Sequence, residues 1–162
     1  MNIQLFTTGG TFDKVYYDAL SDFQIGEPMA TEILREAAVT FAFKVESLLK
    51  KDSLELSDED RALIRSKVLA CPTRHILITH GTDTMTQSAA VLQGIAGKVI
   101  IFTGAMQPAR MRNSDAAFNL GVAIGALQCL SDGVYIAMSG RIFPADKVQK
   151  NRAAGCFEQS AG

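Results

Sequence analysis

Residues 75–85, His75-Ile76-Leu77-Ile78-Thr79-His80-Gly81-Thr82-Asp83-Thr84-Met85, join two structural patterns at one glycine turn. The first five residues are a short, continuous apolar run, which is typical of a parallel β-strand covered on both faces. After the turn, apolar residues recur at helical spacing from residue 85 to 95, and Gly97 ends the pattern. A strand, a polar glycine turn and a helix in this order predict one unit of an α/β fold.

The same alternation extends to both sides of this segment. Further strands are predicted at residues 2–8, around 41–45, 98–103 and 134–138. Further helices are predicted at 28–38, starting at Pro28, at 57–69, starting at the Ser57–Asp60 capping box, and at 114–130. Residues 11–27 show no clear period and are predicted to be a loop that can move. Together these elements predict one α/β domain over residues 1–162, Rossmann- or flavodoxin-like, with three layers and helices on both faces of a mainly parallel sheet.

Composition narrows the classes of function. The 162 residues carry 16 Lys+Arg and 17 Asp+Glu, a net charge of −1, and 48% are hydrophobic. This balance excludes a disordered chain and argues against nucleic acid as a partner. We find no apolar run of the ~18 residues that a membrane helix needs and no signal-peptide pattern at the N-terminus. The three cysteines show no CxxC spacing, so we expect neither a disulfide framework nor a metal site, and a cytoplasmic location.

Three of the predicted strands end in polar turns that contain glycine. These turns are Thr8-Gly9-Gly10-Thr11, Thr79-His80-Gly81-Thr82-Asp83-Thr84 and Thr103-Gly104-Ala105-Met106. The carboxyl ends of parallel strands meet at one edge of a sheet, where α/β proteins bind ligands. We therefore expect a small-molecule site at this edge.

The side chains of these turns favour acyl transfer, although other interpretations stay open. Threonine hydroxyls become nucleophiles when a base or hydrogen-bond network assists them, and glycine turns let backbone N–H groups approach an oxyanion. A phosphate cradle is weakly supported, because neither GxGxxG nor GxxxxGK[ST] is present. His80 lacks the HExxH context of a metal site, and Asp83 competes with Thr84 for the role of helix cap.

Four motifs, in the same order along the chain, resemble the asparaginase/glutaminase family. They are Thr7-Thr8-Gly9-Gly10-Thr11, Ile78-Thr79-His80-Gly81-Thr82-Asp83-Thr84-Met85, Phe102-Thr103-Gly104-Ala105-Met106-Gln107-Pro108 and Ser114-Asp115-Ala116-Ala117-Phe118-Asn119-Leu120. The resemblance runs from residue 3 to about 152. It implies a domain of the N-terminal asparaginase type over residues 1–162, with L-asparagine as substrate. It also implies two-step hydrolysis to L-aspartate and ammonia, without a metal or organic cofactor.

The resemblance also assigns expected roles to the catalytic positions. Thr11 matches the first catalytic threonine, the expected nucleophile, and Thr82 matches the second threonine, near the scissile amide. Asp83 matches the aspartate that contacts both the substrate amino group and a lysine. Lys150 is the better match for that lysine and Lys147 the competing one. The resemblance leaves open which threonine attacks first.

Substrate-binding positions are implied in the same way. Asp52 and Ser53 match positions that bind the α-amino and α-carboxylate groups, and Gly10 and Gly81 bring backbone N–H groups close to the substrate. A family tyrosine closes over the site from a mobile loop. Tyr17 is the choice here, with Tyr16 as the alternative.

Length is the main departure from the family. Typical members carry a C-terminal domain that completes a neighbouring subunit's site, whereas this chain ends at Gly162. We expect a functional short form, with a fragment as the alternative, that assembles as a homo-oligomer. Glutaminase activity is expected to be weak, since a pocket discriminates one methylene by roughly 10–200-fold. Two other functions stay open: a non-catalytic amino-acid-binding protein and an amidotransferase module that needs a partner.

Overall fold

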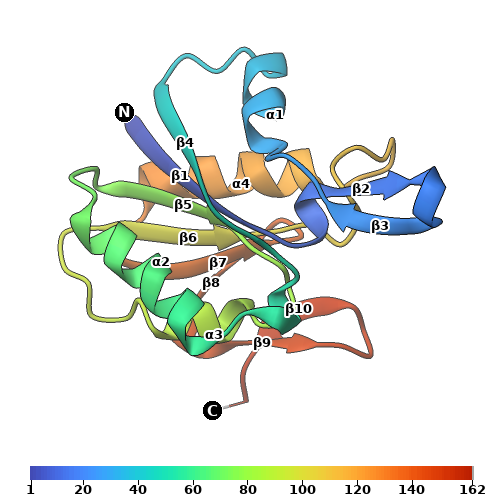
Figure 1. Ribbon diagram of the computed structural model, residues 1–162. Coiled ribbons are helices and arrows are strands. Elements are labelled where there is room, and N and C mark those ends of the chain that lie inside the picture. Colours follow the sequence, from blue (N-terminus) through green and yellow to red (C-terminus); the bar gives the residue numbers. More distant parts are fainter. Residues whose placement is uncertain (162) are drawn as a thin grey trace.

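A six-stranded sheet forms the centre of the computed structural model, which describes residues 1–161 (Figure 1). The strand order is β4-β1-β5-β6-β7-β8; the first five strands are parallel and β8 is antiparallel to β7. Their bounds are β1 Asn2–Gly9, β4 Ala42–Lys51, β5 His75–Thr79, β6 Val99–Thr103, β7 Gly133–Met138 and β8 Arg141–Pro144. The predicted strands are therefore confirmed, and β8 adds an edge that was not predicted.

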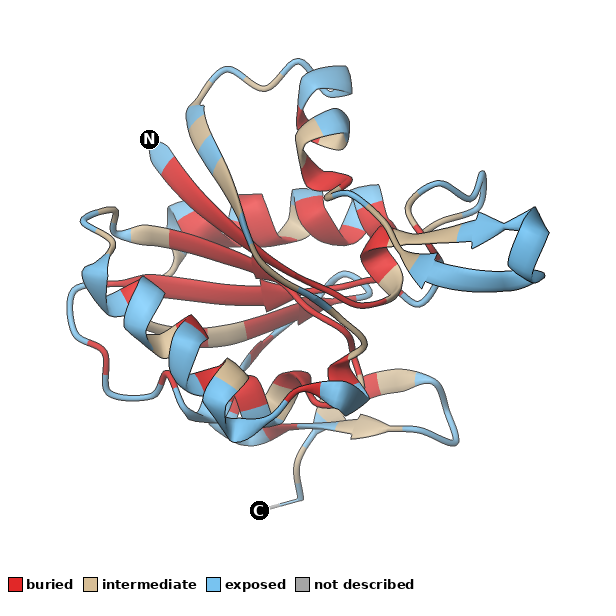
Figure 2. Ribbon diagram, viewed as in Figure 1, coloured by how far each residue is buried: buried red, intermediate tan, exposed pale blue. Residues whose placement is uncertain are grey.

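Two helices cover each face of the sheet. Helices α1 (Ala30–Glu36) and α4 (Ala116–Cys129) lie on one face, and α2 (Asp58–Ala70) and α3 (Met85–Ala90) on the other (Figure 1). A hydrophobic core lies on each face of the sheet. Alternate residues of β5 pack into one core or the other, because successive side chains of a strand point to opposite faces. The strands between these layers are buried along much of their length (Figure 2). The predicted three-layer α/β architecture is confirmed.

Local side-chain bonds set the helix starts. The capping box of α2 forms as predicted: Ser57 Oγ accepts from Asp60 N–H at 3.2 Å, and the Asp60 carboxylate accepts from Ser57 N–H at 2.9 Å. Helix α4 begins at Ala116, two residues later than predicted, because Ser114 Oγ accepts the Ala116 N–H at 3.0 Å. Helix α1 also begins two residues after Pro28.

The helix predicted from residue 85 to 95 was too long. Helix α3 ends at Ala90, and the chain continues in turns with i→i−3 bonds, such as Leu92 N–H to Ala89 O at 3.1 Å. Gly94 then takes a φ of 79°, in the left-handed region that a right-handed helix cannot continue through.

The loop predicted over residues 11–27 is instead mostly regular structure. A 3₁₀ helix η1 (Thr11–Asp13) leads into an antiparallel hairpin of β2 (Lys14–Tyr17) and β3 (Asp22–Ile25), joined by η2 (Asp18–Leu20). The rings of Tyr16 and Phe23 pack across the two strands with centroids 5.2 Å apart. Such aromatic cross-strand pairs stabilise hairpins, which explains the ordered segment.

A second hairpin closes the chain. After η4 (Ala145–Lys147), β9 (Val148–Asn151) pairs with β10 (Cys156–Gln159). Val148 and Phe157 anchor this hairpin in the core beneath α3. It therefore presents the chain segment that carries Lys150 to the carboxyl edge of the sheet.

Within residues 1–161, no helix has the length and hydropathy needed to cross a membrane. In the same residues, no group of three or more His, Cys, Asp or Glu side chains is placed to hold a metal ion. Cys71, Cys129 and Cys156 are free thiols.

Candidate functional site

The turns after β1, β5 and β6 meet at one edge of the sheet, as predicted. Thr8 Oγ1 donates to the carbonyl of Thr79 at 3.0 Å, and His80 N–H donates to the carbonyl of Thr103 at 2.9 Å. These bonds tie the turn after β5 to the turns on either side of it. The edge therefore has a fixed geometry.

Gly10 lies directly against Gly81. A Cβ atom on Gly10 would stand 2.5 Å from the backbone nitrogen of Gly81, and Gly10 has a φ of 79°. Both the conformation and the space require glycine. Because Thr11 and Thr82 each follow one of these glycines, the contact brings the two threonine turns together.

This contact yields a stability prediction. We expect Gly10→Ala to lower the free energy of unfolding by roughly 2 kcal/mol or more, because it adds a backbone clash to positive-φ strain. Gly94→Ala is the matched control, since Gly94 has the same φ of 79° but nothing within 4 Å of its Cβ position. It should cost about 1 kcal/mol. Urea unfolding measures both, and equal losses would show that the Gly10–Gly81 contact contributes nothing.

Lys150 joins Thr82 and Asp83 into one network. Its Nζ donates to Thr82 Oγ1 at 2.7 Å and to Asp83 Oδ1 at 2.8 Å. The Lys150 side chain is 13% exposed and that of Asp83 is 34% exposed, so the amine is largely shielded from water while the carboxylate stays accessible. Arg152 Nε lies 3.8 Å from the same Asp83 oxygen, but its side chain is 67% exposed. The hydroxyl, amine and carboxylate thus form a preorganised chain of hydrogen bonds. Lys147, the competing candidate for this lysine, is exposed.

Asp83 is available for this network because it does not cap α3. Thr84 occupies the N-cap position, and its Oγ1 donates to the carbonyl of Ser53 at 2.7 Å. Ser53 also lies against Gly81, where a Cβ atom would stand 2.6 Å from the Ser53 Cβ. The structure therefore brings Ser53 and both glycines into the same cluster as Thr82.

Asp52 lies beside this cluster at the start of η3 (Ser53–Glu55). Its carboxylate accepts from Leu54 N–H at 3.1 Å and pairs with Lys14 Nζ at 3.2 Å. Partial burial acts to raise the pKa of Asp52, but the bonds from Leu54 and Lys14 outweigh it and lower the pKa below its usual value. Asp52 is thus a carboxylate already paired with a cation from the hairpin.

Thr11 opens η1 and is half-buried. The residues behind it, Phe12 and Asp13, are buried, and the Asp13 carboxylate accepts the Met29 N–H at 2.9 Å. Burial raises the pKa of Asp13 to about 6, although the bond from Met29 lowers it in part. Asp13 therefore links the Thr11 turn to the start of α1.

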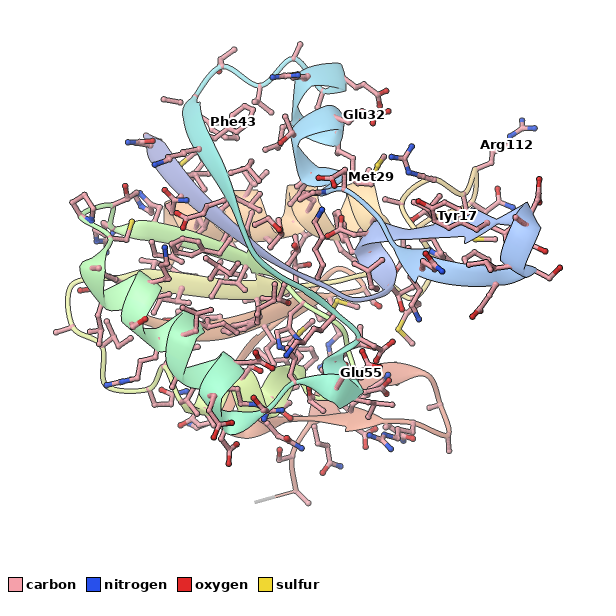
Figure 3. The ribbon with its side chains drawn as sticks, in the orientation of Figure 1. Tyr17, Met29, Glu32, Phe43, Glu55 and Arg112 are labelled. Carbon is pink, nitrogen blue, oxygen red and sulfur yellow. The ribbon has the colours of Figure 1, made fainter. Side chains whose placement is uncertain are left out.

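Tyr17 is not among the residues that the structure brings together. It is 47% exposed and lies on the β2–β3 hairpin (Figure 3). Side chains alternate along a strand, so Tyr16 shares its face with Lys14 and with its cross-strand partner Phe23, while Tyr17 takes the other face. The role of Tyr17 stays a prediction. Tyr16 is 49% exposed and shares its face with Lys14 and Phe23, two residues that lie around Thr11.

His80 supports the turn rather than facing the cluster. It is fully buried, with Nδ1 2.6 Å from the carbonyl oxygen of Gly81 and Nε2 2.7 Å from Ser88 Oγ. Since a carbonyl only accepts, Nδ1 carries the proton and Ser88 donates to Nε2. Burial lowers the pKa of His80 to about 4, so the ring is neutral at pH 7.

Three charged residues near the cluster were not singled out from the sequence: Asp13, Lys14 and Arg152. Asp13 and Lys14 lie two and three residues after Thr11 in the sequence, and this closeness was the one feature that could have marked them as site residues. Their partners, Met29 and Asp52, lie far along the chain and leave no local pattern.

The fold and the cluster define an α/β domain with a hydroxyl–amine–carboxylate network at the carboxyl edge of a parallel sheet. The family model described as "Asparaginase, N-terminal" matches residues 2–160, and the chain belongs to the asparaginase family. The resemblance inferred from the four motifs is thereby confirmed.

Known relatives extend beyond this chain. The L-asparaginase of Thermococcus kodakarensis is 29% identical over 169 residues, covering 96% of this chain and 49% of that protein. A solved structure of the thermostable L-asparaginase from Thermococcus kodakarensis superimposes with a TM-score of 0.84 at 26% identity, covering 98% of this chain and 51% of that one. A glutamyl-tRNA(Gln) amidotransferase component from Archaeoglobus fulgidus is 30% identical over 151 residues, covering 86% of this chain and 35% of that protein. The chain thus spans about half the length of the L-asparaginases that it matches.

Proposed function

We propose that this chain is an amidohydrolase that converts L-asparagine to L-aspartate and ammonia through a threonine acyl-enzyme. The observation that carries the proposal is the Thr82–Lys150–Asp83 network, held next to the Thr11 turn by the Gly10–Gly81 contact. A hydroxyl that accepts from a lysine paired with a carboxylate can relay a proton from a neighbouring nucleophile to the leaving group. Membership of the asparaginase family supports L-asparagine as the substrate.

In the proposed first step, Thr11 Oγ attacks the side-chain carbonyl of the substrate. Lys150 donates to the Thr82 oxygen, which leaves the Thr82 O–H free to donate to the leaving nitrogen. Thr82 passes its proton to that nitrogen and takes up the Thr11 proton as the C–N bond breaks and ammonia departs. The positive charge of Lys150 stabilises negative charge that develops on the Thr82 oxygen. Water then cleaves the ester, releasing aspartate and restoring the Thr11 hydroxyl.

Substrate recognition uses the polar groups around Gly81. Asp83 and Asp52 supply carboxylates for the α-ammonium group, and the Ser53 hydroxyl contacts the α-carboxylate. Gly10 and Gly81 lack side chains, so backbone N–H groups can approach the substrate closely. Glutaminase activity is proposed to be weaker by roughly 10–200-fold, the usual selectivity for one methylene.

Tyr16 and Tyr17 provide a test of the hairpin's contribution. We expect that only one of the variants Tyr16→Phe and Tyr17→Phe lowers kcat, because the two side chains point to opposite faces of the hairpin. The alternation of β2 favours Tyr16. Steady-state kinetics on both variants decides the assignment, and unchanged kcat in both would mean that the hairpin supplies no essential hydroxyl.

Assembly and location complete the proposal. A homo-oligomer is supported by exposed apolar side chains on the first hairpin, including Leu20 and Phe23, which are 60% and 42% exposed. Sedimentation equilibrium measures the state directly. A cytoplasmic location is supported by the three free thiols.

The direct test of the proposed function is ammonia release from L-asparagine and, in parallel, L-glutamine by the purified chain. Faster release from asparagine supports an asparaginase. Tight binding of aspartate without ammonia release would favour an amino-acid-binding protein. Release only after a partner protein is added would favour an amidotransferase module, an alternative that the similarity to the Archaeoglobus fulgidus amidotransferase makes concrete.

A further inference from the structure

A pocket of about 260 Å³ opens beside Thr11. The β2–β3 hairpin, marked by Tyr17 in Figure 3, and the loop before α4, marked there by Arg112, lie at its two sides. The lining residues are Thr11, Lys14, Phe23, Gln107, Pro108 and Met111. Thr82, Asp83 and Lys150 are not among the described residues that line this pocket. Thr11 is therefore the residue through which the pocket adjoins the proposed catalytic residues.

The walls of this pocket are mostly apolar. Phe23 and Met111 keep 42% and 45% of their surface exposed, although both are large hydrophobic side chains. The Lys14 ammonium is paired with Asp52, which leaves mainly its methylene stem to line the pocket. Exposed apolar surface gathered in a concave site next to reactive groups is typical of a ligand subsite.

L-Asparagine does not need such a subsite. Its α-groups are recognised around Gly81, its carbonyl carbon reaches Thr11, and its leaving group is only an NH₂. With the carbonyl carbon at Thr11, the space lined by Phe23 and Met111 lies next to the scissile amide and is open to a substituent on its nitrogen. The pocket volume suits one aromatic ring or a short alkyl chain rather than a larger ligand.

We propose that this pocket binds an apolar substituent on the leaving nitrogen, so that the chain also cleaves secondary β-amides of aspartate with apolar amines. The inference rests on the proposed function, because it uses the same threonine chemistry. Thr11 Oγ attacks the amide carbonyl, Thr82 passes its proton to the nitrogen and takes up the Thr11 proton, and the C–N bond breaks to release a primary amine. Water then cleaves the aspartyl ester, giving aspartate and the regenerated hydroxyl.

The test compares L-asparagine with N4-benzyl-L-asparagine, measuring ammonia and benzylamine. We expect kcat/KM for the benzyl amide to exceed that for asparagine by roughly 10-fold or more, the scale of apolar pocket selectivity. Met111→Ser should remove most of this advantage while leaving ammonia release from asparagine unchanged. Leu20→Ser is the control, because Leu20 is an exposed apolar residue of the β2–β3 hairpin that does not line the pocket.

The outcomes separate the two proposals. Ammonia release from asparagine without benzylamine release from the secondary amide would overturn the pocket inference and leave the asparaginase proposal standing. Benzylamine release that is insensitive to Met111→Ser would also overturn the assignment of this pocket. A folded chain that cleaves neither amide would overturn the proposed function and the pocket inference with it.

Discussion

Lys150→Ala should lower kcat for L-asparagine by at least ~10³-fold. The variant removes the amine that bonds to Thr82 and leaves Asp83 without its closest cation. Thr82 then loses both its hydrogen-bond donor and the nearby positive charge. Because Lys150 belongs to neither hydrophobic core, circular dichroism and thermal melting should show a folded protein.

Lys147→Ala is the control for this prediction. Lys147 lies three residues earlier, in the same sequence motif, but its side chain is exposed at the end of η4. Its replacement should change kcat by less than about 2-fold, as expected for a surface substitution. Loss of activity in Lys147→Ala with retention in Lys150→Ala would show that the catalytic lysine is Lys147, three residues earlier in the sequence.

Thr11→Ala should produce a loss of similar size, at least ~10³-fold in kcat, because it removes the proposed nucleophile. The side chain is half-buried at the start of η1, so truncation leaves both cores intact. Thr11→Ser restores a hydroxyl at the same position and should recover most of the activity. This pair of variants separates the chemistry of the hydroxyl from the packing of the side chain.

Wild-type turnover in Thr11→Ala would remove the nucleophile role from this residue. Thr82 would then be the stronger candidate, since it already has an amine at hydrogen-bond distance. Comparing Thr82→Ala with Thr82→Ser in the same assay would show whether Thr82 forms the ester of the acyl-enzyme instead.

The layers of the fold were predictable because they depend on local patterns. The apolar runs of β5 and β6 and the capping box at Ser57 have nearby causes that a sequence displays. The β2–β3 hairpin has no comparable local sequence pattern. Its turn closes at Ser21, with a φ of 47°, a conformation that sequences usually mark with glycine or asparagine. A serine there gives no signal, and the segment resembles a loop.

The candidate site was only partly predictable for a related reason. The convergence of the turns at Gly10 and Gly81 follows from parallel topology, so it could be expected before the structure. The choice between Lys147 and Lys150 depends on how η4 passes into β9, which the spacing alone left open. The ion pair of Lys14 with Asp52 joins residues far apart in the chain and required the three-dimensional fold.

The central claim is that a threonine ester forms and is then cleaved by water, and hydroxylamine competition tests it directly. The purified chain is incubated with L-asparagine and increasing hydroxylamine, while ammonia, aspartate and aspartyl hydroxamate are measured together. We predict that hydroxamate replaces aspartate in proportion to hydroxylamine, and that Thr11→Ala forms neither product. Aspartate as the only acyl product at every hydroxylamine concentration, or full product formation by Thr11→Ala, would contradict the threonine-ester mechanism.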